Sequence, residues 1–208
     1  MSKYQTNTSD KIRDRALEMF NERGIEYVGL REIAADLNMR VSNITYYFPT
    51  KDDLVYEISM ELSKSNAQTI VAAEALTMEE FLKMLHQVFR NHVRFRCLML
   101  SFVHVMKQNK RIATTYKETQ KKRYAAIETN VQALAAGGYL NIKNKNDLKF
   151  LVSAIALISR FWISEAAVSF TQLSDAAQMK HYLELIIKLL TPYATAKAKT
   201  QMDDFLNA

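Results

Sequence analysis

Glycine and proline are scarce along this chain, and their scarcity limits its possible folds more than any other feature of the sequence. Only four glycines and two prolines occur in 208 residues. Sheet proteins need many tight turns, which these two residues favour, whereas long helices exclude both from their interiors. With 49% hydrophobic residues, a chain of this length can also bury a substantial core, as one domain or as two. We therefore expect an all-α fold.

The first fifty residues are expected to form three short helices. Apolar residues recur at helical spacing over residues 9–24, 29–38 and 41–47, and residues suited to helix caps or tight turns bound these segments. A short turn joins the second segment to the third, which is the minimal helix-turn-helix arrangement for reading a DNA major groove. Residues 1–50 therefore predict an N-terminal three-helix DNA-binding unit, and residues 51–208 predict a larger helical domain.

Helices are expected to continue through the rest of the chain. Pro49 ends the third helix, and Thr50 and Asp53 form a capping pattern from which a fourth helix continues to about Ala73. This fourth helix links the N-terminal unit to everything after it. The later helical segments are one that opens at a capping box at 77–80, an apolar stretch at 95–106, the segments 110–138, 146–170 and 174–190, and a short helix that starts at Thr191-Pro192.

Cysteine content and hydropathy indicate where the protein functions. The single cysteine, Cys97, excludes an internal disulfide and fits a reducing compartment. The polar first residues contain no apolar signal segment, and no window reaches the ~18 uncharged apolar residues that a membrane-spanning helix requires. We therefore expect a soluble, cytoplasmic protein.

The positive charge is unevenly distributed. The formal net charge is +6, but residues 1–51 carry eight Lys and Arg against seven Asp and Glu. Residues 83–123 carry eleven basic residues against one acidic residue, Glu118. Overall basicity therefore does not by itself indicate DNA binding, since the excess lies outside the first fifty residues.

Side chains around the third segment alternate as a helix-turn-helix requires. Inward positions must be apolar to hold the two helices together, and outward positions must offer polar or aromatic groups to base edges and phosphates. The inward set is Ile33, Ala34, Leu37, Ile44 and Phe48, and the outward set is Ser42, Asn43, Thr45, Tyr46 and Tyr47. The alternative interpretation is a generic three-helix unit in which Tyr46 and Tyr47 are ordinary packing aromatics.

The segments GIE at 24–26, LREIA at 30–34 and NITYYFPTKDDL at 43–54 resemble the signature of the TetR family of transcription regulators. The resemblance covers residues 9–58, about a quarter of the chain. It implies a homodimeric repressor whose C-terminal helices form the dimer interface and a pocket for a small-molecule effector. Gly29 stands where Thr is usual and Arg40 where Ser is common, so the resemblance does not define the operator sequence.

The resemblance also implies DNA contacts for individual side chains. Arg31 would contact phosphate at the start of the second helix, and Tyr47 and Lys51 would anchor the DNA backbone. The helix macrodipole disfavours cations at helix N-termini, so a phosphate partner explains the presence of Arg31 and Lys51 there. Asn43 can pair bidentately with adenine. The groove-facing set is Ser42, Asn43, Thr45 and Tyr46, and Arg40 adds a contact to phosphate or guanine.

Two segments in the C-terminal half, 146–170 and 174–190, are apolar on two sides. A helix of this kind must bury both sides, one against its own domain and the other against a second copy of the chain in a four-helix interface. The alternative is that both helices lie in the core of a larger monomer. The candidate interface residues are Leu151, Ile155, Ile158, Met179, Leu183 and Ile186.

Candidates for the effector pocket combine apolar surface with a few polar tips, as ligand cavities do. They are Phe89, His104, Met106, Tyr116, Tyr124 and Trp162. The basic segment 83–123 favours an anionic or amphipathic effector, with a solvated basic helix face as the alternative interpretation.

An enzyme is not expected, because no phosphate-binding, nucleophile-elbow or zinc-protease motif occurs, and the four histidines lack the spacing of a zinc site. No cofactor and no metal are predicted. The remaining alternative is a helical adaptor or lipid-binding protein that has lost DNA reading, which Gly29 and Arg40 would favour.

Overall fold

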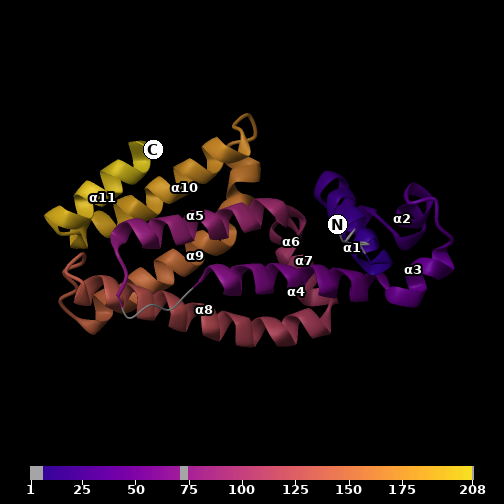
Figure 1. Ribbon diagram of the computed structural model, residues 1–208, viewed down its shortest axis with the longest axis horizontal. Coiled ribbons are helices and arrows are strands. Elements are labelled where there is room, and N and C mark those ends of the chain that lie inside the picture. The colour runs from indigo at the N-terminus through magenta and orange to yellow at the C-terminus, as the bar shows by residue number, and fades with distance from the viewer. Residues whose placement is uncertain (1–6, 71–74, 208) are drawn as a thin grey trace, which may run out of the picture. The chain divides into compact units, whose positions relative to one another are not determined.

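The expected all-α fold is confirmed by a computed structural model that describes residues 7–70 and 75–207. These residues form eleven α-helices and two short 3₁₀ turns, with an isolated bridge between Leu140 and Ala194 (Figure 1). They divide into two compact units. Unit 1 contains the described residues up to Lys64 and the segment Phe95–Tyr116, and unit 2 contains Ser65–Arg94 and the residues from Lys117 onward.

Unit 1 is built on the three N-terminal helices. α2 and α3 pack against each other and against α1. The elements of unit 1 are α1 (Thr8–Arg23), η1 (Ile25–Tyr27), α2 (Leu30–Asp36), α3 (Val41–Tyr47), the first part of α4 (Lys51–Thr69), α6 (Arg96–Leu100), α7 (Phe102–Gln108) and the first turns of α8 (Lys110–Ala136). The predicted bounds of the third helix, 41–47, are confirmed.

Two turns fix how the helices of unit 1 follow one another. Gly24 ends α1 with a φ of 92°, a conformation that costs glycine nothing. Asn38 has a φ of 53° in the turn between α2 and α3, as its ability to adopt the left-handed conformation predicts. After Pro49, the capping box at the start of α4 is present, because Thr50 N donates to Asp53 Oδ2 at 3.1 Å and Asp53 N donates to Thr50 Oγ1 at 3.2 Å.

The core of unit 1 fixes the position of α3. Ile44 is the buried residue of α3 and is fully inaccessible, as are Ile12 of α1 and Ile33 of α2. The same core includes Phe95 and Cys97, so α6 packs against α1 within this unit. Because one face of α3 is locked into this core, its other faces are held in a fixed orientation toward solvent.

Unit 2 is a helical bundle centred on α5 (Met78–Arg94). In Figure 1, α5 lies alongside α9 (Lys145–Ser169) and α10 (Asp175–Leu190), and both of these helices and α11 (Ala196–Asn207) contact it. The predicted capping box of α5 is confirmed, because Thr77 N donates to Glu80 Oε2 at 2.8 Å and Glu80 N donates to Thr77 Oγ1 at 3.2 Å. η2 (Thr191–Tyr193) separates α10 from α11.

Several boundaries differ from those expected. The stretch 95–106 is divided at Ser101 into α6 and α7, and α9 is capped by Asn144, which accepts from Asn146 N and Asp147 N, two residues earlier than predicted. The short helix expected at residue 191 is a 3₁₀ turn, followed by the twelve-residue α11. The predicted end of the fourth helix, Ala73, lies outside the described residues.

α9 is more apolar than the sequence analysis anticipated. By length and mean hydropathy (1.6), it would be able to cross a membrane, although the core helix of a folded domain meets the same two criteria. Arg160 and Glu165 lie within α9, and Trp162 is only 2% exposed. α9 packs against α5 and α10, so its buried side belongs to the core of unit 2.

Candidate nucleic-acid interface

The outward side chains of α3 are exposed as predicted. Ser42, Asn43 and Tyr46 all lie on the surface, and Tyr46 is 80% exposed. Thr45 is half-buried, and its Oγ1 donates to Ser42 O at 3.3 Å. α3 is therefore a short rod that presents hydroxyl, amide and phenol groups to solvent, which is what a recognition helix requires.

The two tyrosines that end α3 are arranged edge to face. The ring centroids of Tyr46 and Tyr47 are 5.0 Å apart at an interplanar angle of 89°. Tyr47 is 39% exposed, and Phe48 beyond it is buried in the core of unit 1. Both rings lie at the surface and contact each other, and neither belongs to the core of unit 1.

Arg31, in α2, and Arg40, the N-cap residue of α3, differ from two arginines of α1 in their pairing. Arg15 is paired with Asp36 at 2.6 Å, and Arg23 with Glu32. Arg31 and Arg40 are exposed, and within residues 7–70 and 75–207 neither forms an ion pair. Positive charge that is unpaired beside a recognition helix can pair with phosphate or with a base.

The start of α2 is capped without a hydroxyl. Gly29 N donates to Glu32 Oε2 at 2.8 Å. This backbone hydrogen bond, followed by the contact with Arg23, lowers the pKa of Glu32. Gly29 offers only its backbone, so the hydroxyl that its usual counterpart would offer to a phosphate is missing.

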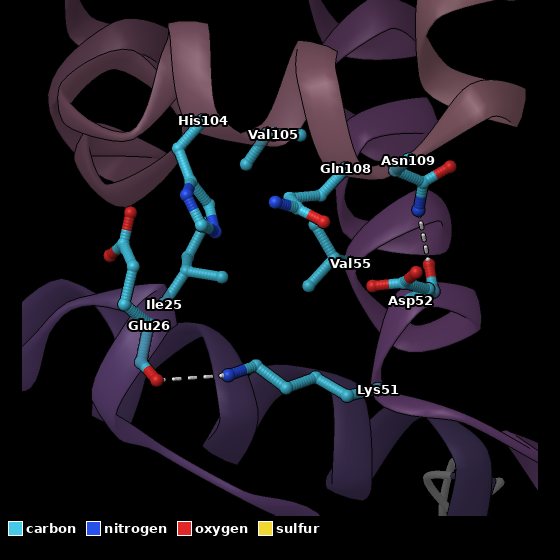
Figure 2. A pocket seen from close by; sticks show the side chains of 9 residues that line it. All are labelled: Ile25, Glu26, Lys51, Asp52, Val55, His104, Val105, Gln108 and Asn109. Carbon is cyan, nitrogen blue, oxygen red and sulfur yellow. Dashed lines mark hydrogen bonds between the residues drawn. The ribbon is translucent and has the colours of Figure 1, made fainter.

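Lys51, at the start of α4, points into a pocket (Figure 2). Its Nζ donates to Glu26 O at 3.4 Å, and partial burial is the main cause that lowers the pKa of Lys51. The pocket has a volume of about 340 Å³, and in Figure 2 the side chains of His104 and Gln108, from α7, extend into it. The predicted phosphate anchor therefore lies against η1 in this conformation.

Polar contacts within unit 1 connect the segment from Ser101 to Arg111 to η1 and to the start of α4, the elements on either side of α2 and α3. Ser101 Oγ donates to Glu26 Oε2 at 2.9 Å, and Asn109 Nδ2 donates to Asp52 O at 2.8 Å. Arg111 pairs with Asp53 at 2.8 Å and lies over the ring of Tyr56, 3.9 Å from its centroid. Sequence reasoning missed these contacts because they join residues about 60 to 75 positions apart.

The predicted effector residues are distributed over both units. The rings of Phe89, on α5, and Trp162, on α9, stack in unit 2 with their centroids 4.8 Å apart. Tyr124, also in unit 2, lies half-buried on α8. The other three belong to unit 1: His104 lines the pocket in Figure 2, Met106 packs on the core, and Tyr116 contacts Phe102 at 5.0 Å. Of this set, Phe89 and Trp162 are brought into direct contact.

A histidine missed by sequence reasoning completes the Phe89–Trp162 pair. Trp162 Nε1 donates to His92 Nδ1 at 3.3 Å, and Phe89 stacks on the His92 ring at 6.1 Å. Burial, and secondarily the charge of Arg123, lower the pKa of His92 to about 3. His92 is therefore a neutral acceptor at physiological pH.

Two polar atoms near this aromatic cluster are buried without a hydrogen-bond partner in the described chain. They are Tyr182 Oη and Ser159 Oγ. The ring of Tyr182 is 5.7 Å from that of Trp162, and Ser159 precedes Trp162 by one helical turn on α9. Because buried polar groups are nearly always paired, these two atoms are notable candidates for contact with a ligand or water.

The predicted dimer residues are mostly internal. Leu151, Ile155 and Ile186 are fully buried, and Leu183 is 3% exposed, while Ile158 and Met179 are half-buried. The apolar side chains that remain exposed on α9 and α10 are Phe150, Leu157, Val168 and Leu185.

The described residues contain no group of three or more His, Cys, Asp or Glu side chains that could hold a metal ion. Burial raises the pKa of the Cys97 thiol to about 12, so this cysteine is an unreactive core residue.

Sequence reasoning missed two exposed apolar or aromatic residues of the N-terminal three-helix unit. Tyr27, in η1, is 76% exposed, and Val41, the first residue of α3, is 37% exposed. Both flank predicted contacts, and burial in the core does not explain either one. A sequence signal existed for Val41, since an outward residue at the start of a recognition helix meets base edges.

A helix-turn-helix whose second helix exposes such side chains defines a class of DNA-binding regulators. The family model described as "Bacterial regulatory proteins, tetR family" matches residues 12–58, and the model described as "Bacterial transcriptional repressor" matches residues 59–202. The chain therefore belongs to the TetR family, whose members are regulators and not enzymes.

Solved structures with the same fold agree. A TetR-family transcriptional regulator from Marinobacter aquaeolei is 22% identical with a TM-score of 0.89, covering 97% of this chain and 98% of that chain. A tetR-family regulatory protein from Rhodococcus is 20% identical with a TM-score of 0.67, covering 89% and 98%. The SmeT-triclosan complex is 14% identical with a TM-score of 0.64, covering 92% and 93%.

One curated relative matches part of the chain. It is the probable HTH-type transcriptional regulator YttP of Bacillus subtilis, 28% identical over 89 residues. The match covers 40% of this chain and spans 43% of that regulator's length. The similarity to YttP is thus confined to less than half of each protein.

Proposed function

We propose that this chain is a homodimeric, cytoplasmic transcriptional repressor that binds a palindromic operator and is released from it by a small-molecule effector. In this proposal residues 1–50 read the DNA, and residues 51–208 bind the effector and dimerise. The observation that carries it is the exposed surface of α3 flanked by the unpaired Arg31 and Arg40. Family membership supports it independently.

The individual roles follow from position and chemistry. Ser42, Asn43, Thr45 and Tyr46 face the groove, and Arg31 and Tyr47 contact the DNA backbone. Lys51 reaches a phosphate by leaving the carbonyl of Glu26, a long hydrogen bond of 3.4 Å that costs little to exchange. Each phosphate contact positions the protein, and each base contact adds sequence preference.

A dimer is proposed because two recognition helices about one DNA turn apart, ~34 to 36 Å, can read a palindrome together. The exposed Phe150, Leu157 and Val168 on α9, with Leu185 on α10, offer an apolar surface to a second copy. The half-buried Ile158 follows Leu157 on α9, and the half-buried Met179 lies on α10, six residues before Leu185. The four internal residues, Leu151, Ile155, Leu183 and Ile186, would support this surface from the core side.

The effector is proposed to bind in unit 2 beside the Phe89–Trp162 stack. Aromatic walls with a few polar atoms are typical of ligand sites, and the unpartnered Tyr182 Oη and Ser159 Oγ supply such atoms. SmeT, which shares the fold, is solved with triclosan bound. An anionic or amphipathic effector would match the basic segment 83–123. A thermal-shift screen in which neutral ligands stabilise the protein and acids do not would reject an anionic effector.

Release from DNA requires that the effector favour a different arrangement of the two DNA-binding units of the dimer. The coupling free energy between effector and DNA binding is typically 1 to 3 kcal/mol. α4 starts directly after the reader and continues to Thr69, so it is the proposed lever. The Asn109–Asp52 and Arg111–Asp53 contacts connect the start of α4 to α7 and α8, and are candidates for a second connection.

The test is an equilibrium binding measurement with the DNA upstream of the protein's own gene, alongside light scattering to determine the mass in solution. Specific, salt-dependent binding by a dimer is expected, with a log–log slope of about 0.9 per neutralised phosphate. A protein that binds no duplex better than random DNA would instead be a helical adaptor or lipid-binding protein.

A further inference from the structure

The recognition helix carries no charged side chain. The seven residues of α3, Val41–Tyr47, offer an apolar group, two hydroxyls, one amide and two phenols around the buried Ile44. The nearest cation along the chain before the helix is Arg40, its N-cap residue. This composition restricts which base edges the helix can recognise.

Each base pair presents a different pattern in the major groove. Guanine offers two acceptors, O6 and N7, which a bidentate cation matches best. Adenine is matched by an amide such as that of Asn43, and the thymine methyl group by an apolar side chain. Thr45 Oγ1 already donates its proton to Ser42 O, so this hydroxyl is left to accept from a base and not to donate to one.

Arg40 is placed to reach a base. It has an extended backbone (φ −73°, ψ 144°) and lies at the N-terminal end of α3, which is the end that contacts base edges. It is exposed and forms no ion pair in the described part of the chain. Arg31, by contrast, starts α2, the helix that crosses the DNA backbone, so it suits phosphate.

Val41 follows Arg40, and its side chain is partly exposed. It is 37% exposed and takes no part in the core of unit 1. An exposed apolar residue at the start of a recognition helix suits a thymine methyl group, and Asn43, two residues later, suits an adenine.

We propose that each operator half-site has a contacted core of A·T pairs, read through Val41, Asn43 and their neutral neighbours, with a single G·C pair read by Arg40. This inference rests on the proposed function and adds the base composition of the operator to it. The presence of one cation at the groove end of α3 and none along its length favours a half-site of this kind, because the hydroxyl groups of α3 discriminate less between bases than Arg40 and Asn43 do.

The test starts from duplexes that the full-length protein selects from a randomised library, measured by fluorescence anisotropy. At the single conserved G·C pair, replacing guanine by 7-deazaguanine removes the N7 acceptor. We expect this change to weaken wild-type binding roughly 5- to 150-fold and to leave Arg40→Ala unaffected. Arg40→Lys keeps the charge without the fork and should also lose the preference.

A second substitution tests Val41. Replacing thymine by deoxyuridine at each position in turn removes one methyl group. At one position this change should lower the affinity of the wild type about fourfold, which corresponds to the burial of one methyl group. The Val41→Ala protein should bind the thymine and deoxyuridine duplexes equally well at that position. Equal losses for both proteins at every position would remove Val41 from the proposal and overturn this part of it.

Arg31→Ala is the matched control for Arg40→Ala, because it should weaken all duplexes alike and reduce the salt slope by about 0.9. The same behaviour from Arg40→Ala would make Arg40 a phosphate contact and overturn the proposal, as would a half-site with several indispensable G·C pairs. A library from which the wild type enriches no duplex, even at low salt, would instead reject the proposed function and this inference with it.

Discussion

The surface of α3 and the aromatic cluster of unit 2 use similar side chains in opposite ways. Tyr46 on α3 is 80% exposed, whereas Trp162 on α9 is 2% exposed. Trp162 Nε1 donates to the buried His92, while the phenol of Tyr46 lies open to solvent. The comparison teaches that an aromatic residue at helical spacing serves binding or stability according to which helix face the tertiary packing covers.

The largest effect on stability is expected from truncating Trp162, the buried aromatic residue of this comparison. Trp162→Ala should lower the free energy of unfolding by about 3 to 5 kcal/mol, because it leaves a cavity beside Phe89. Tyr46→Ala and Ser153→Ala, both at exposed positions, should change it by less than about 0.5 kcal/mol. Denaturant unfolding monitored by circular dichroism measures all three.

If Trp162→Ala does not fold, Trp162→Phe provides the test. This change keeps an aromatic ring but leaves His92 Nδ1 without its donor, a loss of about 1 to 3 kcal/mol. Equal stability of Trp162→Phe and Ser153→Ala would show that the buried cluster does not stabilise unit 2.

The second prediction concerns Asn43, on the exposed surface of α3. Asn43→Ala should reduce affinity by about 1 to 3 kcal/mol at one base pair only, because its amide reads a base edge and positions nothing else. Its unfolding free energy and its binding to non-specific DNA should be unchanged. Competition titrations against single-base-pair variants of a selected duplex measure the effect, and a uniform loss on every duplex would contradict a base contact.

The third prediction sharpens the difference between the units by pH. The pKa of His92 is about 3 in the folded protein and close to 6.5 when unfolded, so the unfolded chain binds the proton first. Stability is therefore full above pH 6.5 and falls by about 1.4 kcal/mol per pH unit as the pH drops toward 3. Unfolding curves at pH 7 and pH 5 should differ less for His92→Asn than for the wild type.

His104→Asn is the control for this measurement, because His104 is exposed on α7. Identical pH dependence for His92→Asn and the wild type would mean that His92 is not buried in its neutral form.

The smallest effect is expected at the start of α2. Gly29 has ordinary extended backbone angles, and a Cβ there would meet only Glu32 Oε2, at 3.7 Å. Gly29→Ser should therefore stabilise the protein by a few tenths of a kcal/mol through an added N-cap hydroxyl. Gly138→Ser, at a φ of 73°, should destabilise it by roughly 1 kcal/mol. Thermal denaturation compares the two, and a Gly29→Ser protein as unstable as Gly138→Ser would refute the capping argument.

The sequence predicted the three-helix DNA-binding unit well, because the sequence signals that define α1, α2 and α3 are local. The end of α1 at Gly24, the left-handed Asn38 and the bounds of α3 each depend on a few neighbouring residues. The same holds for the exposure of Ser42, Asn43 and Tyr46, which follows from helical spacing once Ile44 is buried. Local hydrogen bonds and one apolar face suffice to specify such a unit.

Sequence predicted unit 2 less well because its helices have apolar residues on several sides. Periodicity could not tell which face of α9 would be covered, so Leu151 and Ile155 were interface candidates although the chain itself buries them. His92 was missed for the same reason, since only the packing of α5 against α9 brings it to Trp162. Contacts between residues far apart in sequence leave no local pattern.

The measurement that tests the central claim most directly is the salt dependence of DNA binding by the full-length protein and its Tyr46→Ala variant. The wild type should bind a selected duplex with affinity that falls linearly in log–log form, by about 0.9 per neutralised phosphate. Tyr46→Ala should unfold like the wild type and yet discriminate less between selected and scrambled duplexes. A wild type that shows no such discrimination, or a variant that retains all of it, would contradict a recognition role for the surface of α3.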